Sequence, residues 1–185
     1  KNKKKKEFRK IKIGAHELAT LNEKFDIIYC KAIEHIHNWE KTFKNIDKVS
    51  KKDSIVYFKH RSFFSYLGAH RYASIGIPWG HVLLKDNEYK RFAKTFHFKR
   101  KAKMINSFFN GLSYPRNSVS DMCEIASKYN FYPIHISSEK PRYFNKILSF
   151  TNSIKDFWKI VRKNYPSVSS EEILSGMYHI VFKKL

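Results

Sequence analysis

Histidines gather in residues 60–84, HRSFFSYLGAHRYASIGIPWGHVLL, where glycine and proline interrupt any regular period. Imidazole titrates near neutral pH, so a histidine beside a bound substrate serves as a general base. The sequence therefore predicts three candidate catalytic bases: His60, His70 and His81. For any single histidine, a hydrogen bond within the protein core is the alternative interpretation.

The same segment offers side chains suited to holding a small substrate. Tyr66 and Trp79 present flat apolar surfaces, and Arg71 adds a cation beside them. Gly68, Gly76, Pro78 and Gly80 predict a loop or lid rather than one long helix. We expect this lid to line the substrate pocket.

Residues 25–59 precede the lid and are expected to position it. Residues 25–30 and 55–58 are short apolar runs that predict strands, and residues 32–49 have apolar side chains at helical spacing. Strand, helix and strand make a βαβ unit with parallel strands. The lid then leaves the carboxyl end of the second strand, where open α/β sheets bind ligands.

The phrase FDIIYCKAIEHI, residues 25–36, resembles the fourth strand and following helix of class I S-adenosylmethionine (SAM) dependent methyltransferases. Members of this family often combine an FD-apolar-apolar strand with EH-apolar shortly after it. IKIGAHELATL, residues 11–21, resembles the family's third strand and the loop beyond it, except that Ala15 stands where an acidic residue is usual. IPWGH in the lid is similar to a stretch found in some members.

The resemblance implies SAM as the cofactor. Cys30, Lys31 and Ala32 would lie beside it by their position in the family, and Glu17 would take the place of the missing acidic side chain. It also implies a glycine-rich turn after a first strand and a carboxylate that binds the ribose. None of the six glycines follows an early strand.

We therefore predict a single partial methyltransferase domain over residues 1–185 that lacks the family's first strands. The expected fold is α/β, with a Rossmann-like, mainly parallel sheet, flanking helices and a closing antiparallel strand pair. Residues 60–112 would form a lid and acceptor insertion, and residues 141–176 a second insertion. A divergent fold that only shares the βαβ pattern is the alternative.

Further elements follow from local patterns. Strands are predicted at residues 11–13, 131–136 and 177–183, with Pro133 indicating an irregular or edge strand. Residues 86–112 have the period of one helix, residues 141–165 contain an aromatic helix, and Asn117 or Ser118 is expected to begin another.

The net charge is +21, with lysine far more frequent than arginine. Such a charge fits a nucleic-acid binder that uses the first ten residues and the basic residues 99–103. We favour a compositional origin, because dedicated phosphate readers rely more on arginine. Two distant cysteines favour a reducing, cytoplasmic location over a disulfide framework, and the spacing of potential ligands predicts no metal site.

The predicted function is transfer of a methyl group from SAM to an oxygen or nitrogen of a small-molecule or glycan acceptor. A non-catalytic methyltransferase-like subunit and a basic nucleic-acid-binding module are the alternatives. No apolar run is long enough to span a bilayer. The sequence leaves the acceptor and the oligomeric state open.

Overall fold

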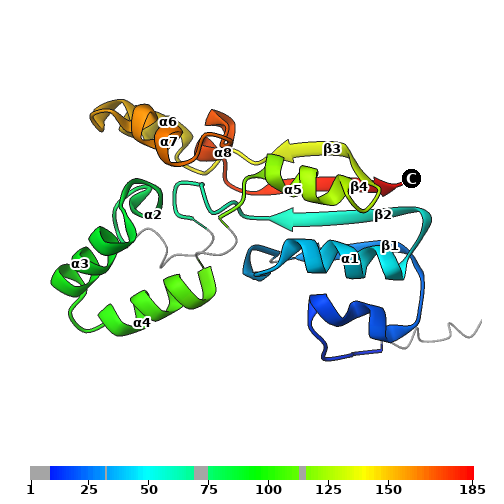
Figure 1. Cartoon of the computed structure of the whole chain (residues 1–185). Helices are drawn as coiled ribbons and strands as arrows, with labels where there is room; N and C mark the ends of the chain where they lie inside the picture. Colours follow the sequence, from blue (N-terminus) through cyan, green and yellow to red (C-terminus); the bar gives the residue numbers. More distant parts are fainter. Residues whose placement is uncertain (1–8, 32, 69–74, 113–115) are drawn as a thin grey trace, which may run out of the picture.

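The computed structural model describes residues 9–31, 33–68, 75–112 and 116–185. His70 and Arg71 of the predicted site, and Ala32, lie outside these residues. None of the helices in the described ranges is long and apolar enough to cross a membrane. Figure 1 shows a small sheet with helices on one face and a group of helices beyond one end.

The sheet has four strands in the order β1-β2-β4-β3. They are β1 (Phe25–Lys31), β2 (Ser50–His60), β3 (Phe131–Ser138) and β4 (Tyr178–Lys184). β1 pairs parallel to β2, whereas β4 lies antiparallel between β2 and β3. β1, β2 and β3 therefore run in one direction, and the expected closing antiparallel pair is confirmed.

One face of the sheet is covered by α1 (Trp39–Val49) and α5 (Val119–Ser127) (Figure 1). Phe43 lies at the centre of this layer, where its ring contacts those of Phe58, Phe131 and Phe182. Asn38 begins α1 by accepting a hydrogen bond from the Lys41 backbone at 2.7 Å. These contacts explain why the apolar stripe predicted for this helix faces the strands.

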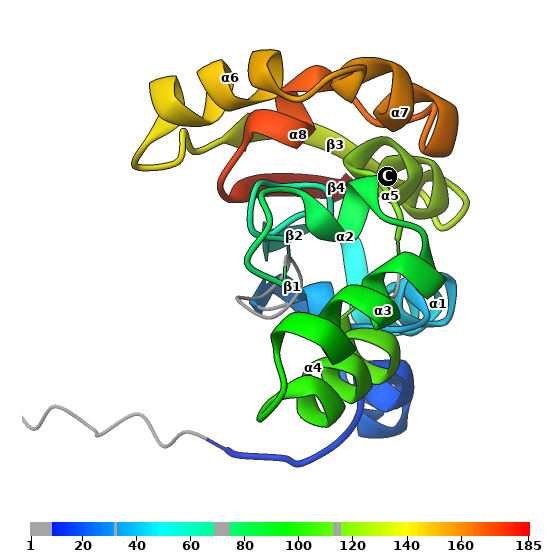
Figure 2. The same cartoon turned by 90° about the vertical axis from the view of Figure 1, so that its left-hand side faces the viewer.

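The second layer of structure is a helical cap beyond the carboxyl ends of β1, β2 and β3 (Figures 1 and 2). It combines both predicted insertions, which share one hydrophobic core. The first contributes α2 (Gly80–Leu83), α3 (Asp86–Phe96), α4 (Lys101–Ser107) and the π-helical turn η3 (Phe108–Leu112). The second contributes α6 (Phe144–Ser153), α7 (Phe157–Asn164) and α8 (Ser170–Leu174).

Three sequence predictions about elements are wrong. Residues 11–13 form no strand, and their isoleucines are exposed; the chain instead makes a 3-10 helix, η1 (Ala15–Leu21), that packs on α1. The helix predicted from residue 32 begins only at Trp39, after the 3-10 turn η2 (Ile33–His35). The helix predicted over residues 86–112 breaks at His97, whose Nε2 donates to the Ile75 carbonyl at 2.7 Å.

Local predictions for the second half are closer to the structure. Ser118 begins α5, and its Oγ accepts a hydrogen bond from the Asp121 backbone at 3.0 Å. β3 has a register shift between Pro133 and His135, which is the irregularity expected at that proline. The aromatic helix within residues 141–165 is two helices, because Asp156 has a left-handed backbone with φ 57° between them.

The second face of the sheet is open among the described residues. Ile27 is 72% exposed and Tyr29 is 58% exposed, and both alternate with the inward-facing Ile28 and Cys30 of β1. Tyr29 stacks on Tyr57 of the neighbouring strand with ring centroids 5.2 Å apart. β1 is also an edge strand, so apolar side chains and unpaired backbone lie together at one side of the sheet.

Candidate functional site

The carboxyl edge of the sheet carries a pocket of about 270 Å³, here called the edge pocket. Three chain segments meet there: the residues after β2, the residues after β3 and the residues before β4. They become neighbours because β4 enters the sheet antiparallel between the other two strands. The polar and aromatic lining includes Arg61, Ser65, Tyr66, Glu139, Lys140, Arg142 and Ser175.

Backbone hydrogen bonds fix two of these segments to each other. The Gly176 amide donates to the Glu139 carbonyl at 2.8 Å, and the Glu139 amide donates to the Met177 carbonyl at 2.7 Å. A Cβ at Gly176 would lie 3.1 Å from the Glu139 carbonyl oxygen. Glycine at this position therefore allows the close approach that forms the floor of the edge pocket.

A second pocket, of about 470 Å³, lies beyond the carboxyl end of β1 and is here called the β1-end pocket. η1 contributes Ala15 and His16, and the segment that enters α1 contributes Thr42 and its neighbours. Thr42 is buried, and its Oγ1 has no hydrogen-bond partner among the described residues. This oxygen is itself enclosed by protein, so a ligand in the pocket would reach it only after the wall moves.

The predicted cofactor residues take different places around β1. Glu17 lies in η1, and its Oε2 accepts a hydrogen bond from the Gly14 amide at 2.9 Å. Lys31 is exposed at the carboxyl end of β1, and Cys30 is half-buried in that strand. Burial raises the pKa of the Cys30 thiol to about 11, so this group is a neutral thiol rather than a nucleophile.

The two predicted histidines that the structure describes, His60 and His81, lie in different places. His60 ends β2 on the inward face, 2% exposed, with its ring edge against Trp39 at 5.5 Å between centroids. His81 lies inside the cap, where its Nε2 donates to the Phe63 carbonyl at 2.6 Å. Burial lowers the pKa of His60 to about 3 and that of His81 to about 4. In this arrangement both are neutral packing groups, and a catalytic role for them stays a prediction.

Of the two described residues predicted to contact the acceptor, only Tyr66 lines the edge pocket. Trp79 is fully buried in the cap core, and its Nε1 donates to the Ile173 carbonyl at 3.0 Å. Its ring meets those of Tyr66 and Phe157 edge-on at 5.2 and 4.9 Å. Trp79 therefore supports the wall that Tyr66 presents to the pocket.

Glu172 of α8 is a charged group that the sequence analysis did not single out. It is 2% exposed, and its Oε1 accepts hydrogen bonds from Ser62 Oγ at 2.5 Å and from the Val119 amide at 3.2 Å. Burial raises the pKa of this carboxyl to about 7. The only sequence signal was its place next to Glu171 at a helix start, which is typical of a solvated first turn.

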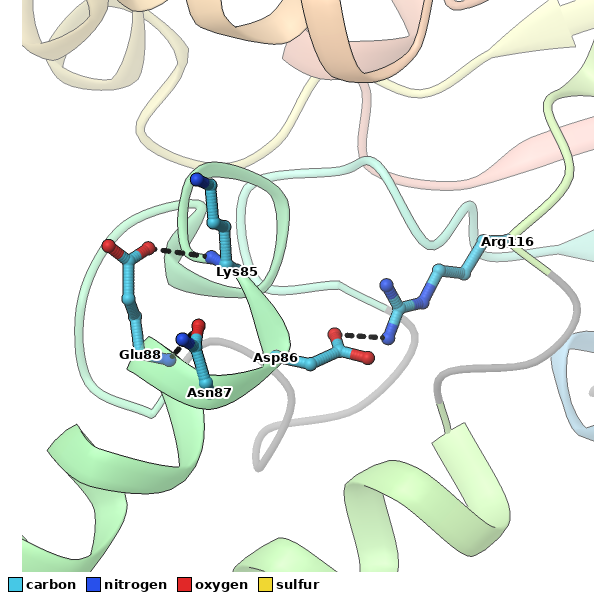
Figure 3. Close-up of polar contacts among 5 residues, drawn as sticks. All are labelled: Lys85, Asp86, Asn87, Glu88 and Arg116. Atoms are coloured by element: carbon cyan, nitrogen blue, oxygen red, sulfur yellow. Dashed lines mark hydrogen bonds and ion pairs between the residues drawn. The ribbon is translucent and has the colours of Figure 1, made fainter.

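An ion pair joins the start of α3 to the segment before α5. Arg116 Nη2 lies 2.8 Å from Asp86 Oδ1 (Figure 3). Two further hydrogen bonds order the same helix start: Lys85 N donates to Glu88 Oε2 at 2.9 Å, and Glu88 N donates to Asn87 Oδ1 at 2.8 Å (Figure 3). The Arg116 guanidinium also lies over the Phe63 ring, so it connects the cap with the sheet layer.

Metal chemistry has no candidate site in the described ranges, where no group of three His, Cys, Asp or Glu side chains could hold an ion. The glycine-rich turn that the family resemblance implies is not seen among the described residues. In the part of the chain that the structure describes, no glycine-rich turn follows a strand that lies beside β1.

No protein-family model matches the chain, and no curated protein matches its sequence. Solved structures do show similarity. The cyclopropane synthase MmaA2 from Mycobacterium tuberculosis has a TM-score of 0.47 at 17% identity, and the match covers 90% of this chain and 58% of that one. Phosphoethanolamine N-methyltransferase 2 from Haemonchus contortus, solved with S-adenosyl-L-methionine, has a TM-score of 0.39 at 14% identity, and the match covers 86% of this chain and 33% of that one.

PKMT2 from Rickettsia typhi is a third similar structure, with a TM-score of 0.42 at 12% identity and coverage of 87% of this chain. Its own chain is covered over 35% of its length. The present chain therefore spans between about one third and three fifths of the solved proteins that it resembles.

Proposed function

We propose that this chain is the C-terminal part of a class I SAM-dependent methyltransferase domain and that it supplies the acceptor side of the active site. The observation that carries the proposal is the sheet. A parallel β1–α1–β2 unit with the family-like phrase FDIIYCKAIEHI is followed by two strands that close as an antiparallel pair. The family resemblance predicts such a closing pair.

The open side of β1 supports the same proposal. Parallel strands that are apolar on both faces belong inside a sheet with helices on both sides. Here Ile27 and Tyr29 face solvent, and β1 has no outer neighbour among the described residues. We propose that its occupant is a polypeptide segment with the family's first strand and glycine turn, which would pair parallel to β1 and place helices on the open face.

The residues present do not by themselves fit SAM. The Thr42 hydroxyl beside the β1-end pocket is enclosed, and the glycine turn and the ribose carboxylate have no counterpart beside β1 in the described ranges. We therefore derive no methyl-transfer step from this chain alone. Its own contribution is to bind and orient an acceptor at the carboxyl edge of the sheet, where correct placement lowers the barrier most.

The test is to compare this chain with a longer polypeptide in which a segment with the proposed first strand and glycine turn precedes Lys1. Hydrogen exchange of the β1 amides should become slower in the longer protein, because an added strand protects the outer edge. Transfer of radiolabelled methyl groups should appear only in the longer protein. Unchanged exchange in β1 together with no methyl transfer would contradict the proposal.

A second function, nucleic-acid binding, is favoured by one surface. Phe96 and Phe98 are 67% and 75% exposed at the end of α3 and in the turn that follows, beside the basic residues 99–101. Lys101 Nζ lies 4.8 Å from the Phe98 ring centre. Exposed aromatic rings among cations are a stacking platform for single strands.

The Phe98→Ala variant tests whether this exposed surface binds single-stranded nucleic acid. Single-stranded RNA binding should weaken several-fold in the variant, and the affinity of the wild-type protein should fall steeply with salt. Phe150→Ala, at an exposed ring on α6, is a control of the same kind. Equal binding by both variants would rule out a platform at the α3–α4 turn.

A further inference from the structure

We propose that the edge pocket binds a phosphate or carboxylate group of the methyl acceptor, with Arg61 and Arg142 as its principal ligands. This inference rests on the proposed function only where it identifies the bound molecule as the methyl acceptor. The binding of an anion at this place is a property of the chain itself and stands or falls separately.

The fold brings the two arginines to the pocket from distant parts of the sequence. Arg61 follows β2 directly, and Arg142 lies in the loop that leaves β3. Both strands end at the same edge, because each is antiparallel to β4. Lys140 lies beside Arg142 in that loop and also lines the pocket.

The guanidinium donors of Arg61 are unused among the described residues. This side chain is half-buried, and it makes no hydrogen bond or ion pair with a described residue. A guanidinium carries five donors in a planar fork, which matches the paired oxygens of a phosphate or carboxylate. Arg142 lies over the Tyr143 ring at 5.3 Å, a contact that leaves the edge of its guanidinium available for donation.

The one carboxylate in the lining does not cancel these cations. Glu139 Oε1 accepts a hydrogen bond from His179 Nε2 at 2.7 Å, and this bond is the main reason that the pKa of Glu139 is lowered. Lys59 and Arg61 lower the pKa further, so the field at this carboxylate is positive. Among the described lining residues, three cationic side chains thus face one carboxylate that already has a partner.

The size of the pocket indicates what enters it. A volume of about 270 Å³ is at the lower limit of small-molecule sites, so it accommodates a head group rather than a whole large ligand. Tyr66 and Leu67 add apolar surface to a lining that also contains the polar loop residues. A small acceptor with one anionic end and a less polar body fits this lining.

The test uses inorganic phosphate and the chain as it is. At pH 8 phosphate is mainly a dianion. Titration at constant ionic strength should move the amide NMR signals of Gly176 and its neighbours, which form the pocket floor. Arg61→Gln and Arg142→Gln should each weaken phosphate binding about tenfold or more, the effect of losing one charge-assisted hydrogen bond.

Arg162→Gln is the matched control, since it removes the same charge from an exposed position of α7, outside the pocket lining. Equal weakening in all three variants, or no movement of the Gly176 amide at tens of millimolar phosphate, would overturn the proposal. The longer polypeptide separates the two claims. If the longer polypeptide transfers methyl groups but Arg61→Gln does not weaken phosphate binding, the proposed anion site is refuted and the proposed function stands. If phosphate binds at the edge pocket but the longer polypeptide transfers no methyl groups, the proposed function is refuted and the anion site stands.

Discussion

Glu172 is the residue at which burial and charge conflict most directly. Its pKa is raised to about 7 from an ordinary value of 4.5, because burial outweighs the hydrogen bonds from Ser62 and Val119. A carboxyl whose pKa is higher in the folded protein than in the unfolded chain makes its full contribution to stability at pH values below the unfolded-state pKa. That stability is lost as the pH rises through the folded pKa. The loss occurs between about pH 4.5 and pH 7.

The size of this effect follows from the shift. A difference of 2.5 pH units corresponds to about 3 kcal/mol at 1.36 kcal/mol per unit. Glu172→Gln keeps an oxygen that can accept from Ser62 and removes the charge. The variant should therefore have nearly the wild-type free energy of unfolding at pH 4.5 and exceed it by about 3 kcal/mol at pH 8.

Urea unfolding at several pH values measures this difference. His60 and His81 also titrate with shifted pKa, but both proteins contain them, so their contributions cancel in the comparison. Glu124→Gln, at an exposed position of α5, is the control and should keep the wild-type dependence on pH, because Glu124 does not contribute to the Glu172 shift. A constant difference between Glu172→Gln and wild type over this range would refute the reasoning, since it would mean that the Glu172 charge is not desolvated.

Three further substitutions test the packing by urea unfolding. Trp79→Ala should cost about 3–5 kcal/mol, because it empties a fully buried site in the cap core; a loss below about 1 kcal/mol would contradict that burial. Ser118→Ala should lower the free energy of unfolding by about 1 kcal/mol through loss of the α5 cap, and an unchanged value would contradict that capping bond. For His60→Phe, the difference in free energy of unfolding between the variant and wild type should increase by about 2 kcal/mol in favour of the variant when the pH falls from 8 to 5. The lowered His60 pKa makes wild-type stability fall as the pH drops below 6.5, so an unchanged difference would contradict the burial of a neutral imidazole.

The elements that local sequence could predict are those that local contacts determine. Ser118 caps α5 through a residue three positions away, and Pro133 disturbs β3 because it lacks a backbone donor. Residues 11–13 have a strand-like pattern, but a strand also needs a neighbour, and none lies beside them in the described part of the sheet. The helix break at His97 depends on the Ile75 carbonyl from another segment, which no local pattern contains.

The candidate site was harder to predict than the fold for the same reason. The described residues that follow β2 lie at its carboxyl end, and their role as a lid stays a prediction. Local sequence does not indicate that Trp79 and His81 lie inside a core, because the segment between β3 and β4 supplies their surroundings. Arg142 and Gly176 join Arg61 only once β4 is known to enter between β2 and β3. Their positions next to predicted strand ends were the available signal.

Calorimetry of SAM binding tests the central claim most directly. The account predicts no measurable binding by the 185-residue chain, and micromolar binding by the longer polypeptide that includes the segment beside β1. Ile27→Lys, at an exposed position of β1, should leave the short chain folded and weaken SAM binding by the longer one, because the lysine would lie under the added layer. Micromolar binding by the 185-residue chain alone would contradict the account.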